Sequence, residues 1–308
     1  MRKILPIFLA IMMFANLTFA NPYVIGVKEA YELLNKEDVI FIDSEDSQTY
    51  QKAHIPSAIN IDSLSLQDIA IKNNEKQRCK YLPLCPETAS KIFSQKGIKN
   101  DSLIIIYSSK DPPNKATYLW FLLYSMGHDD KKLKILDGGL ERWIEEGLPT
   151  ESGDEKPLKK SKYKVKPRYE VVATKEDVLK HVKNYENGID DGTILVDTRT
   201  FLEFTGRQDM EGIKRSGHIP GAKFVYWRWF QGKGTTYKPL DKLRDEVKKI
   251  NLDLNKKIIL YCTIGNRSSF VFIPLKALGA KDLRIYTGSW YEWGNDESLP
   301  LEKEKYRD

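Results

Sequence analysis

The sequence predicts an α/β fold built from two tandem domains, each with a mostly parallel β-sheet flanked by helices. Two observations lead to this prediction. Short apolar runs with strand character alternate with longer segments of helical pattern, which is typical of parallel sheets covered by helices. The same series of motifs also occurs twice in the same order, so one domain plan accounts for both halves of the 308 residues.

Four pairs of short segments carry the repeat. They are VIFID at 39–43 with ILVD at 194–197, AHIPSA at 53–58 with GHIPGA at 217–222, LIIIY at 103–107 with KIILY at 257–261, and LDGGLERW at 136–143 with YTGSWYEW at 286–293. The spacing between them is nearly the same in both halves. We therefore predict a first domain at 21–150, a linker at 151–168 and a second domain at 169–308.

The central strands are the bare apolar runs at 103–107 and 257–261, as expected of strands buried on both faces. The helical patterns that follow them lie at 117–126 and 269–278. Ligands of parallel sheets bind beyond the carboxyl ends of the strands. The segment YCTIGNRSS at 261–269 lies at such an end, so it is the first candidate for a site.

The first 20 residues have the pattern of a secretory signal. Arg2 and Lys3 precede an apolar run, and a small residue, Ala20, ends the segment. Cleavage is predicted after Ala20, and an uncleaved N-terminal anchor is the alternative, although the apolar run is short for a bilayer. The mature protein is therefore expected to be periplasmic or secreted, with no membrane partner after cleavage.

The charge distribution argues against a nucleic-acid partner. Lys and Arg total 49 and Asp and Glu total 43, and these charges are interspersed, giving a net charge of +6. The densest basic run, KPLKKSKYKVKPR, lies at 156–168. We interpret this run as a solvated linker, and a site for an anionic partner is the alternative.

The chain has three cysteines. Cys79 and Cys85 lie close together in CKYLPLC and are a possible disulfide in an oxidising compartment, with two unpaired, packed thiols as the alternative. No metal site is predicted, because none of the four histidines is near this pair in sequence. If the pair is bonded, Cys262 is left over as a reactive or a buried thiol.

The chemistry of the loop after residue 261 favours a reactive thiol. A loop that closes onto a helix start turns its backbone N–H groups inward, and these groups and the helix dipole favour an anion. Cys262 at its head should have a lowered pKa. Gly265 lets the chain turn, and Arg267 adds a positive charge. These features describe a nucleophilic sulfur in an anion cradle, and a buried structural cysteine is the alternative.

In combination, these motifs resemble the tandem-domain rhodaneses, a family of thiosulfate and 3-mercaptopyruvate sulfurtransferases. The segments that carry the resemblance are VDTR at 196–199, GHIPGA at 217–222, CTIGNRSS at 262–269 and YTGSWYEWG at 286–294, with their counterparts in the first half. The resemblance covers essentially the whole mature chain.

The resemblance implies that Cys262 takes the outer sulfur of a small anionic donor such as thiosulfate and carries it as a persulfide. A thiophilic acceptor, which is cyanide in the assay and a thiol or carrier protein in the cell, then removes this sulfur. No metal or organic cofactor is implied. The residues expected to bind the donor are Arg199, Thr263, Ile264, Gly265, Asn266 and Arg267.

Several of these residues have a second interpretation. Arg199 matches a family arginine that binds anionic substrate, and the alternative is a surface ion pair with Glu203. Asp197 is interpreted as structural. His54 and His218 occur in both halves, including the half without the reactive cysteine, and this favours a structural role over that of a general base.

The first half has lost the reactive loop. Ser108 stands where Cys262 is expected, and a hydroxyl cannot form a persulfide. Asp111 would bring a negative charge to the cradle, and Pro112 and Pro113 lack N–H donors. This half is expected to be a structural partner that covers the active cleft of the other.

The sequence leaves three alternatives to a thiosulfate sulfurtransferase. Thr263 and Ile264 match neither the thiosulfate nor the mercaptopyruvate type of loop, so mercaptopyruvate and polysulfide stay open as donors. A non-enzymatic persulfide carrier is a second possibility. A phosphatase is disfavoured, because four residues separate Cys262 from Arg267 where that class has five.

Overall fold

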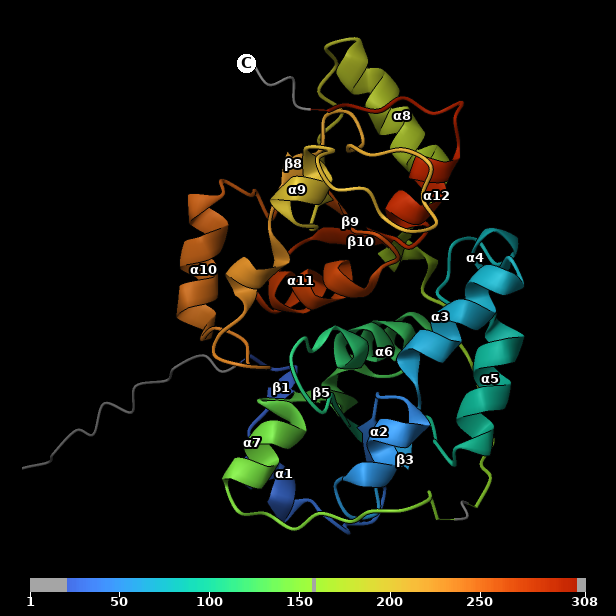
Figure 1. Ribbon diagram of the computed structural model, residues 1–308, viewed down its shortest axis with the longest axis vertical. Coiled ribbons are helices and arrows are strands. Elements are labelled where there is room, and N and C mark those ends of the chain that lie inside the picture. The colour runs from blue at the N-terminus through green and yellow to red at the C-terminus, as the bar shows by residue number, and fades with distance from the viewer. Residues whose placement is uncertain (1–20, 157–158, 304–308) are drawn as a thin grey trace, which may run out of the picture.

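A computed structural model describes residues 21–156 and 159–303, and the predicted signal segment at 1–20 lies outside the described residues. Each half of the chain forms a five-stranded sheet in which every pair of neighbouring strands is parallel. Helices flank both sheets (Figure 1). The predicted α/β fold with two tandem domains is confirmed.

In the first half, the strand order is β1-β5-β4-β2-β3. Its strands are β1 (Val24–Ile25), β2 (Val39–Asp43), β3 (Ile59–Asn60), β4 (Leu103–Tyr107) and β5 (Leu133–Leu136). Its helices are α1 (Val27–Glu32), α2 (Ser47–Lys52), α3 (Ser63–Lys72), α4 (Glu75–Arg78), α5 (Pro86–Gln95), α6 (Asn114–Ser125) and α7 (Gly139–Glu145).

In the second half, the order β6-β10-β9-β7-β8 repeats this topology. Its strands are β6 (Val172–Ala173), β7 (Thr193–Asp197), β8 (Lys223–Phe224), β9 (Lys257–Tyr261) and β10 (Asp282–Tyr286). Its helices are α8 (Lys175–Glu186), α9 (Phe201–Phe204), the 3-10 helix η3 (Trp227–Phe230), α10 (Leu240–Lys249), α11 (Asn266–Ala277) and α12 (Ser289–Asn295).

The repeat extends to single side chains. The Tyr107 hydroxyl accepts a hydrogen bond from the Ile55 N–H at 3.0 Å, and the Tyr261 hydroxyl accepts one from the Ile219 N–H at 3.1 Å. Each tyrosine ends the central strand of its sheet and holds the turn of the HIP motif. These equivalent contacts explain why the motifs recur in the same order.

The two halves share one apolar core, centred on helices α6 and α11. These helices lie side by side between the sheets (Figure 1). The Phe121 and Phe272 rings meet edge to face with centroids 5.0 Å apart, and the Thr117 and Ser269 hydroxyls are hydrogen-bonded at 3.1 Å. Burial of both helices on nearly all sides makes the two domains one packed unit. No helix in the described part of the chain is both long and apolar enough to cross a membrane.

The connecting segment at 151–168 runs along the first domain. The Tyr163 side chain is buried, and the Ser161 N–H donates to the Ser94 carbonyl at 2.9 Å. The lysines around Tyr163 face solvent, as the interpretation of the basic run anticipates. The expectation of a wholly solvated linker is wrong at Tyr163, because an apolar ring in a basic run still gains free energy by burial.

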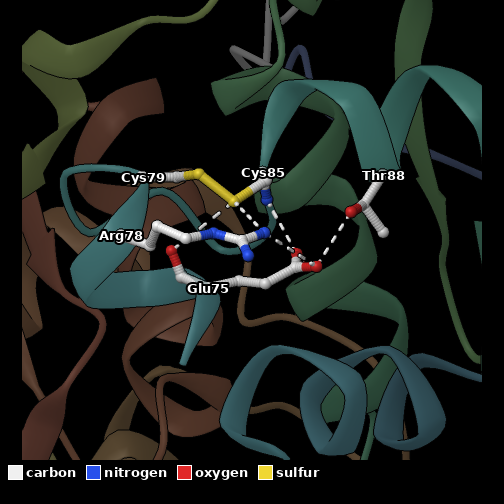
Figure 2. Close-up of a disulfide and its surroundings, with 5 residues drawn as sticks. All are labelled: Glu75, Arg78, Cys79, Cys85 and Thr88. Carbon is white, nitrogen blue, oxygen red and sulfur yellow. Dashed lines mark hydrogen bonds and ion pairs between the residues drawn. A yellow bond between two sulfur atoms is a disulfide. The ribbon is translucent and has the colours of Figure 1, made fainter. Parts of the chain in front are cut away.

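Cys79 and Cys85 are joined by a disulfide between α4 and α5 (Figure 2). The buried Glu75 carboxylate lies beneath it. This carboxylate accepts hydrogen bonds from the Cys85 N–H at 2.9 Å and from the Thr88 hydroxyl at 2.8 Å. The short helix α4 is thus tied to the start of α5 by one covalent bond and two hydrogen bonds.

Candidate active site

The predicted reactive loop lies at the carboxyl end of β9, the central strand of the second sheet. Cys262 directly follows β9, and α11 begins at Asn266. Gly265 has a φ of 108°, which favours glycine, and a Cβ there would lie 3.5 Å from the Tyr118 ring. The loop therefore turns tightly enough to direct its N–H groups at its own first residue.

The sulfur of Cys262 is surrounded by donors. The Gly265 N–H donates to Sγ at 3.1 Å, and the Ser268 hydroxyl lies 3.8 Å from it. Burial alone would raise the pKa of this thiol, but the charge of Arg267 and the N–H groups of Ser268, Gly265 and Ile264 outweigh burial and lower it. Because Cys262 is only 1% exposed, these protein groups, rather than water, stabilise the thiolate.

The first two carbonyl groups of the loop, those of Cys262 and Thr263, accept hydrogen bonds from the first turn of α12. The Trp290 N–H donates to the Cys262 carbonyl and the Tyr291 N–H to the Thr263 carbonyl, both at 2.9 Å. The YTGSWYEW motif therefore supports the reactive loop from behind, in addition to packing in the core.

Arg267 is bound to a carboxylate that belongs to α9. Its guanidinium donates two hydrogen bonds to Glu203, at 2.6 and 2.8 Å, and it also contacts the Thr263 hydroxyl. Burial would raise the pKa of Glu203, but the pairing with Arg267 outweighs burial and lowers it to about 2. Arg267 therefore acts on the Cys262 sulfur as one member of an ion pair and not as a free cation.

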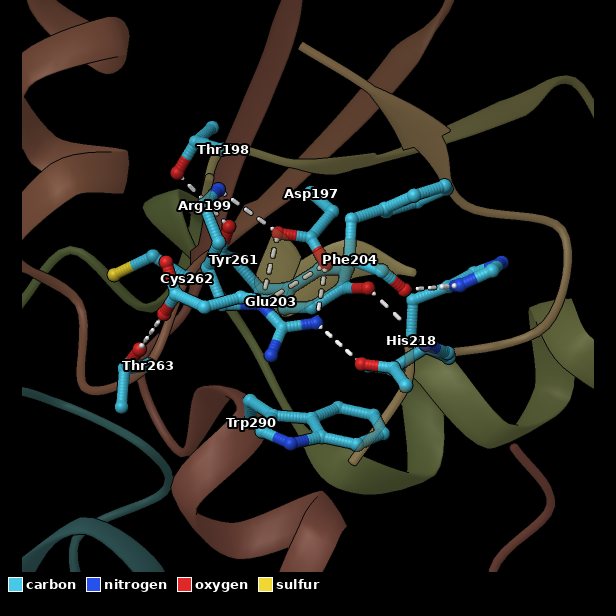
Figure 3. A network of polar contacts seen from close by, with 12 residues as sticks. Asp197, Thr198, Arg199, Glu203, Phe204, His218, Tyr261, Cys262, Thr263 and Trp290 are labelled. Carbon is cyan, nitrogen blue, oxygen red and sulfur yellow. Dashed lines mark hydrogen bonds and ion pairs between the residues drawn. The ribbon is translucent and has the colours of Figure 1, made fainter. Parts of the chain in front are cut away.

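Arg199 lies in a buried network of polar contacts close to Glu203 (Figure 3). Its Nη2 donates to Asp197 at 2.6 Å and to the Gly217 carbonyl at 2.7 Å, and the guanidinium stacks on Trp290 at 4.7 Å. The side chain is 1% exposed. The alternative of a surface ion pair with Glu203 is wrong, because Arg199 is buried against Asp197 and Glu203 pairs with Arg267.

The two histidines of the HIP motifs make the same contacts in both halves. His218 stacks on Phe204 and its Nδ1 lies 2.8 Å from the Phe204 carbonyl. His54 stacks on Tyr50 and its Nδ1 lies 2.8 Å from the Tyr50 carbonyl. Both rings fix a turn to a helix end, which is the structural role expected of them.

The equivalent loop of the first half is built around carboxylates. Ser108 stands at the strand end and its Oγ accepts from the Ala116 N–H at 3.2 Å. Glu45 occupies the position that corresponds to Arg199 and pairs with Lys115. Asp111 pairs at 2.9 Å with Arg228 of the second half. This loop therefore has no thiol, and it has a carboxylate where its counterpart has Arg199; Lys115, at the second position of α6, pairs with that carboxylate.

Sequence reasoning missed four residues around the loop. Glu203 was considered only as a partner of Arg199. The other three come from the first half: the Lys76 ammonium donates to the Ile264 carbonyl at 3.2 Å, Gln67 bonds to the Asn266 side chain, and Tyr118 packs against Gly265. No pattern in the sequence marks the three residues of the first half, because each reaches the loop only through the packing of the two domains.

Comparison with known proteins agrees with this geometry. The family model of the Rhodanese-like domain matches residues 26–146 and 181–296. The sulfur carrier protein TtuD of Thermus thermophilus is 33% identical over 279 residues, which is 87% of this chain and 91% of that protein. A putative thiosulfate sulfurtransferase of Saccharopolyspora erythraea is 32% identical over 284 residues, covering 89% of this chain and 93% of that protein.

Solved structures show the same fold. The 3-mercaptopyruvate sulfurtransferase SseA of Escherichia coli matches with a TM-score of 0.72 and 25% identity over 87% of this chain and 98% of that one. EanB in complex with ergothioneine matches with a TM-score of 0.78 and 21% identity over 93% of this chain and 71% of that one. The chain therefore belongs to the rhodanese family of sulfurtransferases, with two tandem Rhodanese-like domains.

Proposed function

We propose that the protein transfers the sulfane sulfur of thiosulfate to a thiophilic acceptor through a persulfide on Cys262. The thiolate attacks the outer sulfur, the S–S bond of thiosulfate breaks, and sulfite leaves with the bonding electron pair. Attack on the persulfide by cyanide or a thiolate then forms the new bond to sulfur and regenerates the Cys262 thiolate. Charge and electrons balance in both steps.

The observation that carries the proposal is the set of N–H donors around the Cys262 sulfur. An N–H bond to Sγ at 3.1 Å and a lowered thiol pKa favour the ionised nucleophile. The same donors are placed to hold the terminal sulfur of a persulfide, which also carries negative charge. Every group in this description is a side chain or backbone group of the chain itself.

Intact mass of the purified protein tests the proposal. Exposure to thiosulfate is expected to add the mass of one sulfur, and cyanide is expected to remove it and release thiocyanate. A protein that gains no sulfur from thiosulfate, but gains it from mercaptopyruvate or polysulfide, would replace the donor and keep the mechanism. No gain with any of the three donors would overturn the mechanism.

A carrier role is the second candidate, since one relative is named a sulfur carrier protein. The number of turnovers separates the two roles. A transferase is expected to release many thiocyanate molecules per Cys262 when thiosulfate and cyanide are both in excess. A carrier would load once and release its sulfur only to a partner protein that presents a thiol.

We also propose a periplasmic location. The signal pattern at 1–20 and the Cys79–Cys85 disulfide support it, because disulfides persist in oxidising compartments. Full-length protein expressed in a bacterial host and recovered from the periplasm is expected to have lost residues 1–20. Retention of the full mass in the cytoplasm would contradict this location.

Replacing Arg267 with alanine is expected to slow persulfide formation roughly tenfold to a hundredfold at neutral pH. The change removes the cation that lowers the pKa of Cys262 and leaves the buried Glu203 carboxylate without its ion-pair partner, so the pKa of Cys262 should rise. Single-turnover loading from thiosulfate, followed by mass, measures the rate.

The double variant Arg267→Ala with Glu203→Gln is the matched control for this prediction, because it removes both charges together. It is expected to load faster than Arg267→Ala alone. Equal loading by the wild type and Arg267→Ala would show that the backbone N–H groups bind the anion without the arginine.

A further inference from the structure

Lys76 belongs to the half without the reactive cysteine, yet its ammonium lies at the reactive loop of the other half. It is 4% exposed, which is rare for lysine. Its Nζ donates to the Thr287 carbonyl at 2.8 Å and to the Ile264 carbonyl at 3.2 Å, both in the second half. Within residues 21–156 and 159–303, no carboxylate lies at ion-pair distance from this ammonium.

A buried ammonium without a carboxylate is costly unless another negative charge compensates it. The nearby groups that can carry such a charge are Cys262 and Glu292, and both act on Lys76 electrostatically. The Glu292 carboxylate is already hydrogen-bonded to the Tyr81 and Tyr286 hydroxyls. These hydroxyls leave the Glu292 charge in place, so Cys262 and Glu292 both compensate the Lys76 charge, and Cys262 has the larger effect of the two.

The contact with Ile264 has a direct geometric consequence. The Ile264 carbonyl and the Gly265 N–H belong to one planar trans peptide group, so they point in opposite directions. Lys76 holds the carbonyl end, and the N–H end donates to the Cys262 sulfur at 3.1 Å. A cation on the carbonyl polarises the peptide and strengthens its N–H as a donor.

Lys76 completes a set of three supports for the loop. The Trp290 and Tyr291 N–H groups hold the carbonyls of Cys262 and Thr263, and Lys76 holds the carbonyl of Ile264. Among these three supports, only the lysine is charged and only the lysine comes from the first half.

We propose that Lys76 is a positioning residue that the first half supplies to the second: it fixes and polarises the Ile264–Gly265 peptide so that its N–H stabilises the anionic sulfur of Cys262. This inference deepens the proposed function, because the anion it serves is the thiolate and persulfide of that reaction. It also gives the half without a reactive cysteine a role in the chemistry.

The position of α4 is fixed on both sides of Lys76. The preceding residue, Glu75, is bound to Cys85 and Thr88, and the disulfide follows at Cys79 (Figure 2). The following residue, Gln77, donates to Glu292 of α12 at 3.0 Å. These contacts therefore hold α4, and with it the Lys76 ammonium, in one place at the interface between the two halves.

The charged and titratable groups around Lys76 and Cys262 affect any pH titration of the Cys262 thiol. Burial lowers the pKa of Lys76 to about 8, although the negative charges of Cys262 and Glu292 oppose this, so the ammonium is protonated at neutral pH. On its own helix the neighbours are Glu75 and Arg78. The Arg267–Glu203 pair and the Tyr118 hydroxyl also lie near enough to Cys262 to interact with its charge, and the Tyr81 and Tyr286 hydroxyls are hydrogen-bonded to Glu292.

The test is a titration of the Cys262 thiolate in the Lys76→Met variant. Methionine keeps the length of the side chain and removes the charge and the donor. Thiolate absorbance is measured against pH, with Cys262→Ser in each background as the blank. The midpoint is expected to rise by roughly one pH unit, which lowers the thiolate fraction about tenfold below both midpoints. Lys72→Met, an exposed lysine on α3, is the matched control and should not move it.

A midpoint equal to that of the wild type in folded Lys76→Met would overturn the inference. A purely structural lysine would change the melting temperature without moving the titration of Cys262. If Lys76→Met does not fold, Lys76→Gln, which removes the charge and keeps a polar amide, decides by the same titration. The measurement uses no sulfur donor, so it judges Lys76 separately from whether thiosulfate loads Cys262.

Discussion

Cys262→Ser is expected to abolish sulfur transfer, with a loss of more than about a thousandfold in turnover of thiosulfate and cyanide. Serine keeps the size of the side chain, but its hydroxyl is not ionised at neutral pH and cannot hold a sulfane sulfur. The fold is expected to be retained, because the change is small and the Ser108 counterpart at the same strand end of the first half is compatible with the fold. Thiocyanate release measures turnover, and thermal unfolding checks the fold.

Adding Ser108→Cys to the Cys262→Ser variant is the matched control. It places a thiol at the equivalent strand end, beside Glu45 in the position that corresponds to Arg199. No sulfur uptake is expected from this double variant, because Pro112 and Pro113 have no N–H groups to offer an anionic sulfur and the Ser109 N–H already donates to Glu45. Sulfur transfer retained by Cys262→Ser alone would contradict the proposed mechanism.

Arg199→Met is expected to lower the free energy of unfolding by about 3–5 kcal/mol at neutral pH and above. The change leaves the fully buried Asp197 carboxylate without its cation. The first half shows the outcome: its counterpart Asp43 has no such arginine, and burial raises the pKa of Asp43 to about 7.

The sign of the pH dependence follows from this comparison. At low pH an unpaired buried carboxyl is protonated in both the folded and the unfolded chain, so it does not lower the free energy of unfolding. At higher pH the unfolded chain releases this proton, while the folded chain must either bury a charge or keep the proton, and both lower the free energy of unfolding. The loss of stability should therefore be small near pH 4 and full near pH 8. Urea unfolding of wild type and variant at both pH values measures it.

Arg228→Met is the matched control for this prediction, because it breaks a half-exposed ion pair with Asp111 and should cost no more than about 1 kcal/mol. If Arg199→Met instead kept its stability and raised the KM for thiosulfate, the arginine would be a donor-binding residue, as the family resemblance implies, and the structural role argued from its contacts would fail.

The sequence by itself determined the fold and the reactive loop. Strand β9, the turn at Gly265 and the start of α11 are consecutive, so the N–H groups that surround Cys262 come from its own neighbours in the chain. The duplicated motifs predicted two parallel sheets because each motif forms a local strand end or turn. Local patterns of this kind are visible in one sequence.

Only the tertiary structure decided which charges meet. Arg199 and Arg267 are both predicted to bind substrate. Arg199 pairs with Asp197, only two positions away, whereas Arg267 pairs with Glu203, 64 positions away, and only packing brings that second pair together. Lys76 lies 188 positions from Ile264 in the chain, and no periodicity links them. The Arg267–Glu203 and Lys76–Ile264 contacts depend on how α9 and α4 pack against the reactive loop and the start of α11, because these groups lie far apart in the chain and meet only in the folded protein.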